Sequence, residues 1–341
     1  MKKRKTYLFS PYPTSEKKNE FIDNFFNTLA EKVHVINHGK KPGARSADFL
    51  KYMFKADVMI LNWPEDILHL RFGLLQLLSS FITLTLYKTR GGKIVWICHN
   101  KDSHKKKYKG LRRMARSFFT KISNVIIVLS HDALNYFVKE KGKTYFLNHP
   151  VYLNPPLLKE DSNLSMCDVL IWGRISPYKG LNEFIGAYRE RNNSFSVNII
   201  GHADKTYLET ITQNSRGLNI NIIDEFISNR ELENHFKKSK IILLPYADSD
   251  TFSSGALVHS LSSNKIVIGP AIGNFLDLNK QEACLVYENF TSLFSTLNLL
   301  LNNQVYYDSE LARLRKGIVN YYRLNTWGKF IEEIVSIVEK K

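Results

Sequence analysis

The residue types best suited to chemistry follow an apolar segment in the second half of this chain. Gly173 and Arg174 come directly after the run Val169–Trp172. Lys179 and Gly180 lie five and six residues beyond Arg174, before a helical pattern. Glycine lets the backbone approach a ligand closely, arginine offers a planar fork to phosphate oxygens, and lysine offers a compact charge. The segment is typical of a phosphate site, but its spacing fits a surface turn with two solvated cations equally well.

A second candidate anion site lies at Ser253, Ser254 and Gly255. These residues follow a polar loop and precede a helical pattern. Serine is a favoured N-cap residue, and the free N–H groups of a helix N-terminus attract anions. The alternative is an ordinary capped helix, which is common. Two such features in one half of the chain favour the anion interpretation.

His99 and Asn100 are candidates for acid–base or hydrogen-bonding chemistry in the first half. They follow the apolar run Ile94–Cys98, so we expect them just beyond a buried strand. A neutral histidine there can accept a proton or bond a hydroxyl group. The alternative is a histidine bonded to the backbone at the strand end.

Apolar segments of strand length alternate with helical patterns, which is typical of βαβ units and parallel sheets. In the first half we expect strands at Thr6–Ser10, Val33–Asn37, Val58–Asn62, Lys93–Cys98, Val125–Ser130 and Thr144–Asn148, and helices at Asn19–Glu31 and Asp132–Lys139. In the second half we expect strands at Asp168–Trp172, Ser196–Ile200, Ile220–Ile223, Ile241–Pro245, Lys265–Gly269 and Cys284–Tyr287, and helices at Gly180–Arg191, Asn229–Lys238, Gly255–Ser262 and Thr291–Asn302. Two doubly wound domains of this kind would bind ligands at the carboxyl ends of their strands.

The domain boundary is expected at a proline-rich segment that begins at Pro150, where the charge balance also changes. Residues 1–150 carry 28 basic and 11 acidic side chains, whereas residues 151–341 carry 20 and 21. We predict an N-terminal basic Rossmann-like domain over 1–150, a linker over 151–165 and a second Rossmann-like domain over 166–320. A C-terminal helix over 321–341 could pack back on the first domain.

The net charge of +16 therefore belongs to the first half, where it could attract nucleic acid, anionic lipid or diphosphate compounds. The run Lys101–Lys121 carries nine Lys or Arg residues and one acid. It could be a solvated helix face, and its few aromatic residues make a nucleic-acid interface less suitable. We favour an anionic membrane surface.

No segment predicts export or a membrane span. The apolar part of the N-terminus, Tyr7–Phe9, is too short for a signal peptide. The uncharged run Phe72–Tyr87 has 16 residues, which is too short to span a bilayer, but it could lie in a membrane interface beside the basic run. The three cysteines form no disulfide or zinc pattern. We expect a cytoplasmic protein, peripheral on the inner face of the plasma membrane.

The ordered segments of the second half resemble the donor domain of GT-B glycosyltransferases, in particular the family-four-like group of bacterial polysaccharide enzymes. The resemblance covers most of Asp168–Gly273, including the strand-Gly-Arg-x4-Lys-Gly segment and the Ser254-Gly255 pair. It implies two Rossmann-like domains with a donor site in the second. The donor-site residues that it implies are Gly173, Arg174, Lys179, Ser253, Ser254 and Gly255 for the diphosphate, and Glu225, Phe226 and Ile227 near the base.

This sequence departs from the family-four pattern at two positions. Phe252 and Ser260 stand where that pattern usually has glutamates, the second of which contacts the donor ribose. Asp248 and Asp250 could contact the sugar instead, or be solvated loop residues. No metal site is expected, because a GT-B enzyme can neutralise the leaving diphosphate with cationic side chains.

The first half resembles the acceptor domain of the same enzymes in its strand-Trp-Pro and strand-His-Asn-x3-His segments. The resemblance implies His99 and Asn100 as catalytic candidates, and Trp63 and His104 on the acceptor side.

We therefore expect a metal-independent transferase of the hexosyltransferase type, without a cofactor. It would move a sugar from a nucleoside-diphosphate sugar to a glycan or polyprenyl-diphosphate-linked acceptor in surface polysaccharide synthesis, and would have no nucleic-acid partner. The alternatives are a basic nucleic-acid-binding α/β protein without transferase activity, and a sugar-nucleotide hydrolase or epimerase of the same fold.

Overall fold

The structure is a computed structural model that describes residues 5–11, 19–41, 43–102, 108–152, 166–247 and 250–341. The chain forms two compact units. The first consists of Met1–Tyr152, Asp250–Ser253 and Asn325–Lys341, and the second of Leu153–Ser249 and Ser254–Leu324. The first unit therefore contains two segments from late in the sequence. Among the described residues, no helix is both long enough and apolar enough to cross a membrane.

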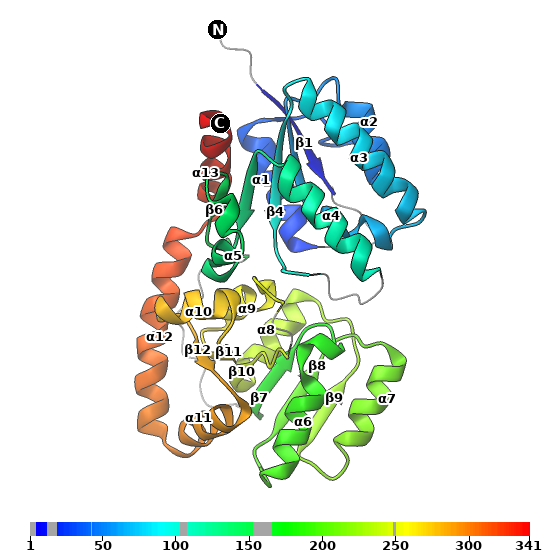
Figure 1. The fold of residues 1–341 in the computed structure, drawn as a ribbon. Helices are drawn as coiled ribbons and strands as arrows, with labels where there is room; N and C mark the ends of the chain where they lie inside the picture. Colours follow the sequence, from blue (N-terminus) through cyan, green and yellow to red (C-terminus); the bar gives the residue numbers. More distant parts are fainter. Residues whose placement is uncertain (1–4, 12–18, 42, 103–107, 153–165, 248–249) are drawn as a thin grey trace. The chain divides into compact units, whose positions relative to one another are not determined.

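The first unit is built on a six-stranded parallel sheet in the order β2-β1-β3-β4-β5-β6; Figure 1 labels β1, β4 and β6 of this sheet. Its strands are β1 (Thr6–Ser10), β2 (His34–Val35), β3 (Val58–Asn62), β4 (Lys93–Cys98), β5 (Val125–Val128) and β6 (Thr144–Phe146). Its helices are α1 (Glu20–Lys32), α2 (Arg45–Tyr52), α3 (Gly73–Thr89), α4 (Lys109–Ile122), α5 (His131–Tyr136) and α13 (Trp327–Lys340), with 3-10 turns η1 (Pro64–His69) and η2 (Val138–Glu140). The chain adds β2 on one side of β1 and then β3 and the later strands on the other side. The switch point of this sheet therefore lies between β1 and β3.

Both faces of this sheet are covered, and β4 shows why. Trp96 and Cys98 belong to an apolar cluster with residues of α2, α3 and α4. Val95 and Ile97 belong to another cluster with residues of α1 and α13. A continuous apolar run is typical of a parallel strand that is buried on both faces.

The second unit contains another six-stranded parallel sheet, in the order β9-β8-β7-β10-β11-β12. Its strands are β7 (Cys167–Trp172), β8 (Val197–Ile200), β9 (Ile220–Ile223), β10 (Ser239–Leu243), β11 (Ile266–Pro270) and β12 (Leu285–Tyr287). Its helices are α6 (Leu181–Glu190), α7 (Lys205–Asn214), α8 (Asn229–Lys237), α9 (Gly255–Ser260), α10 (Gly273–Lys280), α11 (Phe290–Asn302) and α12 (Gln304–Leu324), with turns η3 (Pro177–Lys179) and η4 (Leu261–Ser263). This is the Rossmann strand order, with its switch point between β7 and β10. The expected architecture of two doubly wound parallel domains is confirmed.

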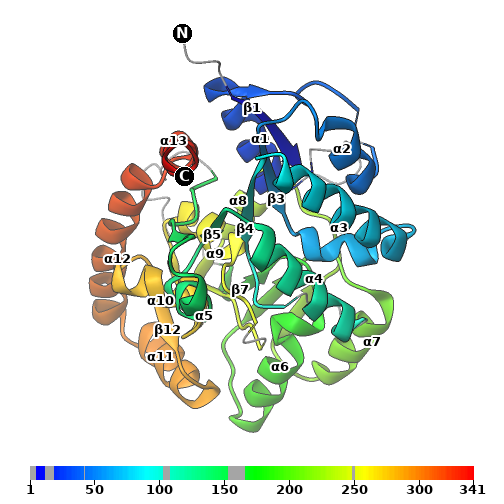
Figure 2. The same cartoon turned by 45° about the horizontal axis from the view of Figure 1, so that its top comes forward.

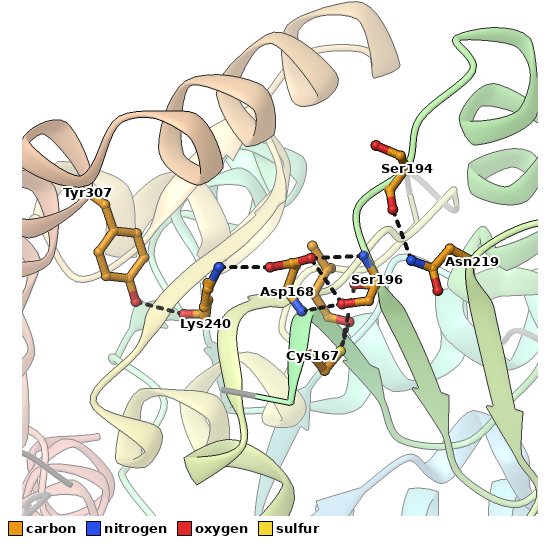
Figure 3. A network of polar contacts seen from close by, with 8 residues as sticks. Cys167, Asp168, Ser194, Ser196, Asn219, Lys240 and Tyr307 are labelled. Atoms are coloured by element: carbon orange, nitrogen blue, oxygen red, sulfur yellow. Dashed lines mark hydrogen bonds and ion pairs between the residues drawn. The ribbon is translucent and has the colours of Figure 1, made fainter. Parts of the chain in front are cut away.

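A polar network fixes the strands of the second unit at their amino ends (Figure 3). Asp168 accepts hydrogen bonds from the amide and hydroxyl of Ser196, at 2.9 and 3.0 Å, and from Lys240 Nζ at 2.9 Å. Tyr307 on α12 donates to the carbonyl oxygen of Lys240. Burial raises the pKa of Asp168, but the hydrogen bonds from Lys240 and Ser196 outweigh burial and leave it below its usual value. This satisfied network joins β7, β10 and the start of β8, and it lies at the edge opposite the carboxyl ends.

Several strands are shorter than predicted: β5 ends at Val128 and β6 at Phe146. The segment 33–37 is shortened most and forms a strand only at His34–Val35, because the side chain of Asn37 replaces the ladder that would follow. Its amide donates to the carbonyl oxygen of Phe9 at 2.8 Å, and its oxygen accepts from the Phe9 amide at 3.3 Å. Asn37 thus satisfies the backbone at the edge of β1.

Two glycines of the second unit give opposite expectations for alanine substitution. Gly201 has φ +153°, and a Cβ there would overlap the carbonyl group of Gly173. Gly186 lies exposed within α6, with open space where its Cβ would be. We expect Gly201→Ala to lower the free energy of unfolding by about 2 kcal/mol or more, and Gly186→Ala to raise it by up to about 1 kcal/mol. Urea unfolding of both variants checks this; equal effects of the two substitutions would contradict the close approach at Gly201.

Candidate functional site

The predicted phosphate segment lies at the switch point of the second unit, where β7 and β10 end. Gly180, with φ +68°, follows η3, and a Cβ there would overlap the carbonyl oxygen of Pro245. Ala247 donates its amide to the carbonyl oxygen of Tyr178 at 3.2 Å. The turn that carries Lys179 is therefore packed against the end of β10. Ligands of doubly wound sheets bind at this position.

Lys179 is buried, with 5% of its surface exposed. Its ammonium group donates to the hydroxyl of Tyr246 at 2.5 Å and lies 4.1 Å from the centre of the same ring. Burial lowers the pKa of Lys179, and the neighbouring Tyr178 opposes that shift. No carboxylate among the described residues pairs with Lys179. The site therefore contains a desolvated cation that lacks an anionic partner.

The polar partners of Lys179 form a hydrogen-bonded chain. Burial raises the pKa of Tyr246 to about 12, so its phenol is protonated at neutral pH. Tyr246 accepts from Lys179, and its hydroxyl lies 2.8 Å from Ser254 Oγ, where either hydroxyl can be the donor. Ser254 Oγ also accepts from the Leu257 amide at 3.1 Å. In either direction, one of the two hydroxyl protons is not used within the chain. That proton and the ammonium group are donors that suit an anion.

The other residues of the predicted diphosphate site are divided between the two units: Gly173, Arg174, Ser254 and Gly255 belong to the second, and Ser253 to the first. Gly173 follows β7 directly, with φ +103°, and Arg174 after it is exposed. Ser254 caps α9, of which Gly255 is the first residue, but α9 has only six residues. Ser253 instead belongs to the first unit, where its amide donates to the carbonyl oxygen of His99 at 3.2 Å. At this candidate anion site, side chains rather than a long helix dipole are therefore the groups available to a ligand.

Phe252 and Ser260, which replace the glutamates of the family-four pattern, both have structural partners. Phe252 is buried in the first unit, where its ring lies 5.5 Å from that of Tyr136. Ser260 is fully buried, donates to the carbonyl oxygen of Ala256 and accepts from Trp172 Nε1, both at 2.8 Å. Since its hydroxyl is occupied on both sides, Ser260 is poorly suited to bind a ribose.

The predicted base region, Glu225–Ile227, lies in the loop between β9 and α8. Phe226 is 86% exposed, so its ring could stack on a planar ligand. Asp250 contributes its carbonyl oxygen to the Lys101 amide at 2.8 Å. His104 and Asp248 lie outside the described residues.

His99 and Trp63 lie together at the carboxyl edge of the first unit's sheet. Their rings are stacked, with centres 3.9 Å apart. His99 Nε2 lies 3.2 Å from Asn62 Oδ1, and burial lowers the pKa of His99 well below its usual value, with His149 adding to the shift. Trp63 adopts a left-handed backbone with φ 43°, and Arg45 donates to its carbonyl oxygen at 2.7 Å. His99 is therefore neutral, and an aromatic stack orients it. The adjacent Asn100 forms an antiparallel bridge with Thr251.

The sequence interpretation missed a buried carboxylate two residues beyond Trp63. Glu65 is 4% exposed, and its Oε1 lies 3.8 Å from Arg116 Nη2 on α4. The same guanidinium group donates to the carbonyl oxygen of Asn100 at 2.7 Å. The sequence signal at this position was the Trp-Pro segment beside Glu65. The burial of Glu65 could not be predicted from it, because that burial depends on a helix fifty residues away. No group of three or more His, Cys, Asp or Glu residues in the described parts of the chain could hold a metal ion.

The fold is shared with solved structures of low sequence identity. No protein-family model and no curated protein matches this sequence. Sucrose-phosphate synthase from Thermosynechococcus elongatus matches with a TM-score of 0.72 and 12% identity over 99% of both chains. HepE from Anabaena, solved with UDP and glucose, matches with a TM-score of 0.71 and 12% identity over 99% of this chain and 100% of HepE.

A glycosyltransferase from Rickettsia africae also matches, with a TM-score of 0.65 and 13% identity, over 99% of this chain and 98% of its own. Agreement over nearly the whole of each chain, together with two Rossmann-like units, shows that this chain has the GT-B fold.

Proposed function

We propose that this chain is a glycosyltransferase that takes a sugar from a nucleoside-diphosphate donor. The observation that carries the proposal is the buried Lys179 ammonium group and the hydroxyl chain that continues from it through Tyr246 to Ser254. A diphosphate offers acceptors, so it would complement that cation and the hydroxyl donor, and Arg174 could join them from the exposed side. HepE was solved with UDP and glucose, so uridine diphosphate is the donor nucleotide to test first.

In the proposed reaction, the second unit stabilises the leaving group. As the bond between the sugar and the diphosphate breaks, negative charge grows on the phosphate oxygens. A preorganised cation in a desolvated site stabilises such charge more effectively than water does. Lys179 and Arg174 would meet that charge without a metal ion, as the expectation of a metal-independent enzyme requires. His99 and Asn100, the catalytic candidates of the sequence, and Trp63, the acceptor-side candidate, stay predictions for the first unit.

A further part of the proposal is that the acceptor is a glycan or polyprenyl-diphosphate-linked glycan of surface polysaccharide synthesis, reached at an anionic membrane. The support lies on α3, which packs between α2 and α4 (Figures 1 and 2). The outer face of α3 carries five exposed apolar side chains: Leu74, Leu75, Leu78, Ile82 and Leu86. An exposed apolar stripe of this kind marks an interaction surface.

The charges around this stripe favour an anionic lipid surface as the partner. The helices α2, α3 and α4 contain one acid, Asp48, which is buried. Their exposed cations include Lys51, Lys109, Arg113 and Lys121. Apolar side chains that enter the headgroup region, flanked by cations, are the features of an interfacial helix. A lipid-linked acceptor would be held at the same surface.

Replacing Lys179 by Met tests the donor site. We expect the affinity for UDP to fall by about 10- to 100-fold, because a hydrogen bond to a charged group is worth about 1.5–3 kcal/mol. The affinity for uridine should stay unchanged. The unfolding temperature without ligand should stay equal or rise, because an unpaired buried charge is removed. Titration calorimetry and thermal unfolding measure these effects.

Lys205→Ala, at the exposed start of α7, is the matched control and should behave as the wild type. A Lys179→Met protein that binds UDP normally would contradict the proposed site. Transfer to an acceptor should also persist in EDTA, and loss of activity that added Mg²⁺ restores would contradict metal independence.

Vesicle sedimentation tests the membrane part. We expect the protein to bind vesicles of phosphatidylglycerol and phosphatidylcholine, to bind less as salt rises, and not to bind phosphatidylcholine alone. Leu75→Gln/Leu78→Gln/Ile82→Gln should weaken binding at least tenfold, because each buried apolar side chain contributes about 1.5–3 kcal/mol.

The matched control is Leu299→Gln/Val305→Gln/Val319→Gln, which removes three exposed apolar side chains from the second unit and should bind as the wild type. Salt-sensitive binding of duplex DNA without vesicle binding would instead favour the nucleic-acid alternative. Equal vesicle binding by the two triple variants would exclude the α3 stripe.

A further inference from the structure

Glu65 is a buried carboxylate at the switch point of the first unit's sheet. It is the third residue after β3, which pairs with β1 on one side and β4 on the other. Asn62 is paired with Ile97 in the β3–β4 register. Glu65 and Asn100 therefore both lie three residues beyond this paired position, at the carboxyl edge where such sheets bind ligands.

The two carboxylate oxygens of Glu65 have different surroundings. Oε1 lies 3.8 Å from Arg116 Nη2, which is longer than a hydrogen bond. Oε2 is buried and has no hydrogen-bond partner among the described residues. Buried polar atoms of folded proteins are almost always bonded, so an exception calls for an explanation. An acceptor atom without a partner at a ligand-binding edge suits a ligand that donates a hydrogen bond.

The histidines at this edge are less suited to accept a proton. The Nε2 atom of His99 lies 3.2 Å from Asn62 Oδ1, an acceptor, so Nε2 carries the proton of the neutral ring. Burial lowers the pKa of His99 well below its usual value, which makes the other nitrogen, Nδ1, a weak base. In His149, Nδ1 lies 2.9 Å from the carbonyl oxygen of Pro150 and Nε2 lies 3.2 Å from the Tyr152 hydroxyl. Both nitrogens of His149 are thus occupied.

We propose that Glu65 accepts the proton of the attacking hydroxyl group in the glycosyl transfer. This inference rests on the function proposed above. The O–H bond of the acceptor breaks as its oxygen bonds to the anomeric carbon, and the proton moves to Glu65 Oε2. The bond between the anomeric carbon and the diphosphate oxygen breaks at the same time, and its electron pair leaves with the nucleoside diphosphate. Glu65 later returns the proton to water.

The charges around Glu65 adjust it to this role. Burial raises its pKa to about 7; Arg116 lowers the pKa, the neighbouring Asp66 raises it, and the backbone amide of Glu65 itself and the Arg45 guanidinium lower it by less. The Cys98 thiol on β4 is protonated, because burial raises its pKa to about 11. The helix α3 packs against η1 and contributes a single charged residue, Lys88, in its last turn. A carboxylate with a pKa near the working pH is an efficient general base.

The test measures UDP release from UDP-glucose, UDP-galactose and UDP-N-acetylglucosamine with water as the acceptor. In wild type, kcat should rise with pH through a limb near pH 7. Glu65→Gln should lower kcat by 100-fold or more and remove that limb. The KM for the donor and the affinity for UDP should change less than threefold. Formate should restore part of the activity of Glu65→Ala, because a small carboxylate can replace the missing base.

Glu31→Gln, at an exposed carboxylate of α1 in the same unit, is the matched control and should keep wild-type kcat within threefold. The inference is overturned if Glu65→Gln stays within threefold of wild-type kcat. It is also overturned if Glu65→Gln loses UDP binding and thermal stability along with activity while formate rescues nothing, which would indicate a structural role. A wild type that neither binds UDP nor releases it from any donor overturns the proposed function itself, and is recognised without any variant.

Discussion

The chemistry of the second unit depends on the burial of one ammonium group, that of Lys179. Removing a charge from water is costly unless the protein supplies compensating partners. Here the compensation is partial, because a phenol and an aromatic ring replace the carboxylate that usually pairs with a buried lysine. The position of the lysine is fixed by Gly180, whose lack of a side chain lets the turn pack against Pro245. The fold thus maintains an unneutralised cation, an arrangement typical of a binding site rather than of a stabilising contact.

Sheet topology places this cation and the buried carboxylate of the first unit at the switch points of their sheets, after opposite members of the two strands that flank each switch. At the switch point of each sheet, the connections that leave two adjacent strands run in opposite directions. Such a divergence leaves a crevice at the carboxyl ends of those strands. Lys179 follows β7 at the switch between β7 and β10, and Glu65 follows β3 at the switch between β1 and β3. In the proposed reaction, the cation meets the charge of the leaving group and the carboxylate takes the proton of the acceptor. The second unit would therefore supply the positive charge for the donor diphosphate, and the first unit the carboxylate for the acceptor hydroxyl.

The features that the sequence predicted are those encoded by neighbouring residues. The doubly wound fold follows from short apolar runs, and Lys179 could be found because it lies six residues after Gly173. Tyr246 could not, because it meets Lys179 across 67 residues. The helix α7 was not expected because its apolar stripe is short: Ile211 is buried, and Tyr207 and Leu208 are only partly buried against the core. Glu65 was missed for a similar reason, since a glutamate becomes a buried, perturbed group only through residues that other helices bring to it.

The replacement of glutamate at Phe252 and Ser260 changes which part of a donor the site can recognise. A carboxylate near the diphosphate would bind sugar or ribose hydroxyl groups, but it would also offset part of the charge of Lys179. In this chain Phe252 is buried among apolar residues of the first unit, and Ser260 is fully bonded within the second. Consequently, neither position places a carboxylate that would offset the charge of Lys179, whose partner in the described residues is the Tyr246 hydroxyl. In the proposed function, binding energy is therefore concentrated on the diphosphate, and selectivity for the sugar must come from residues other than these two.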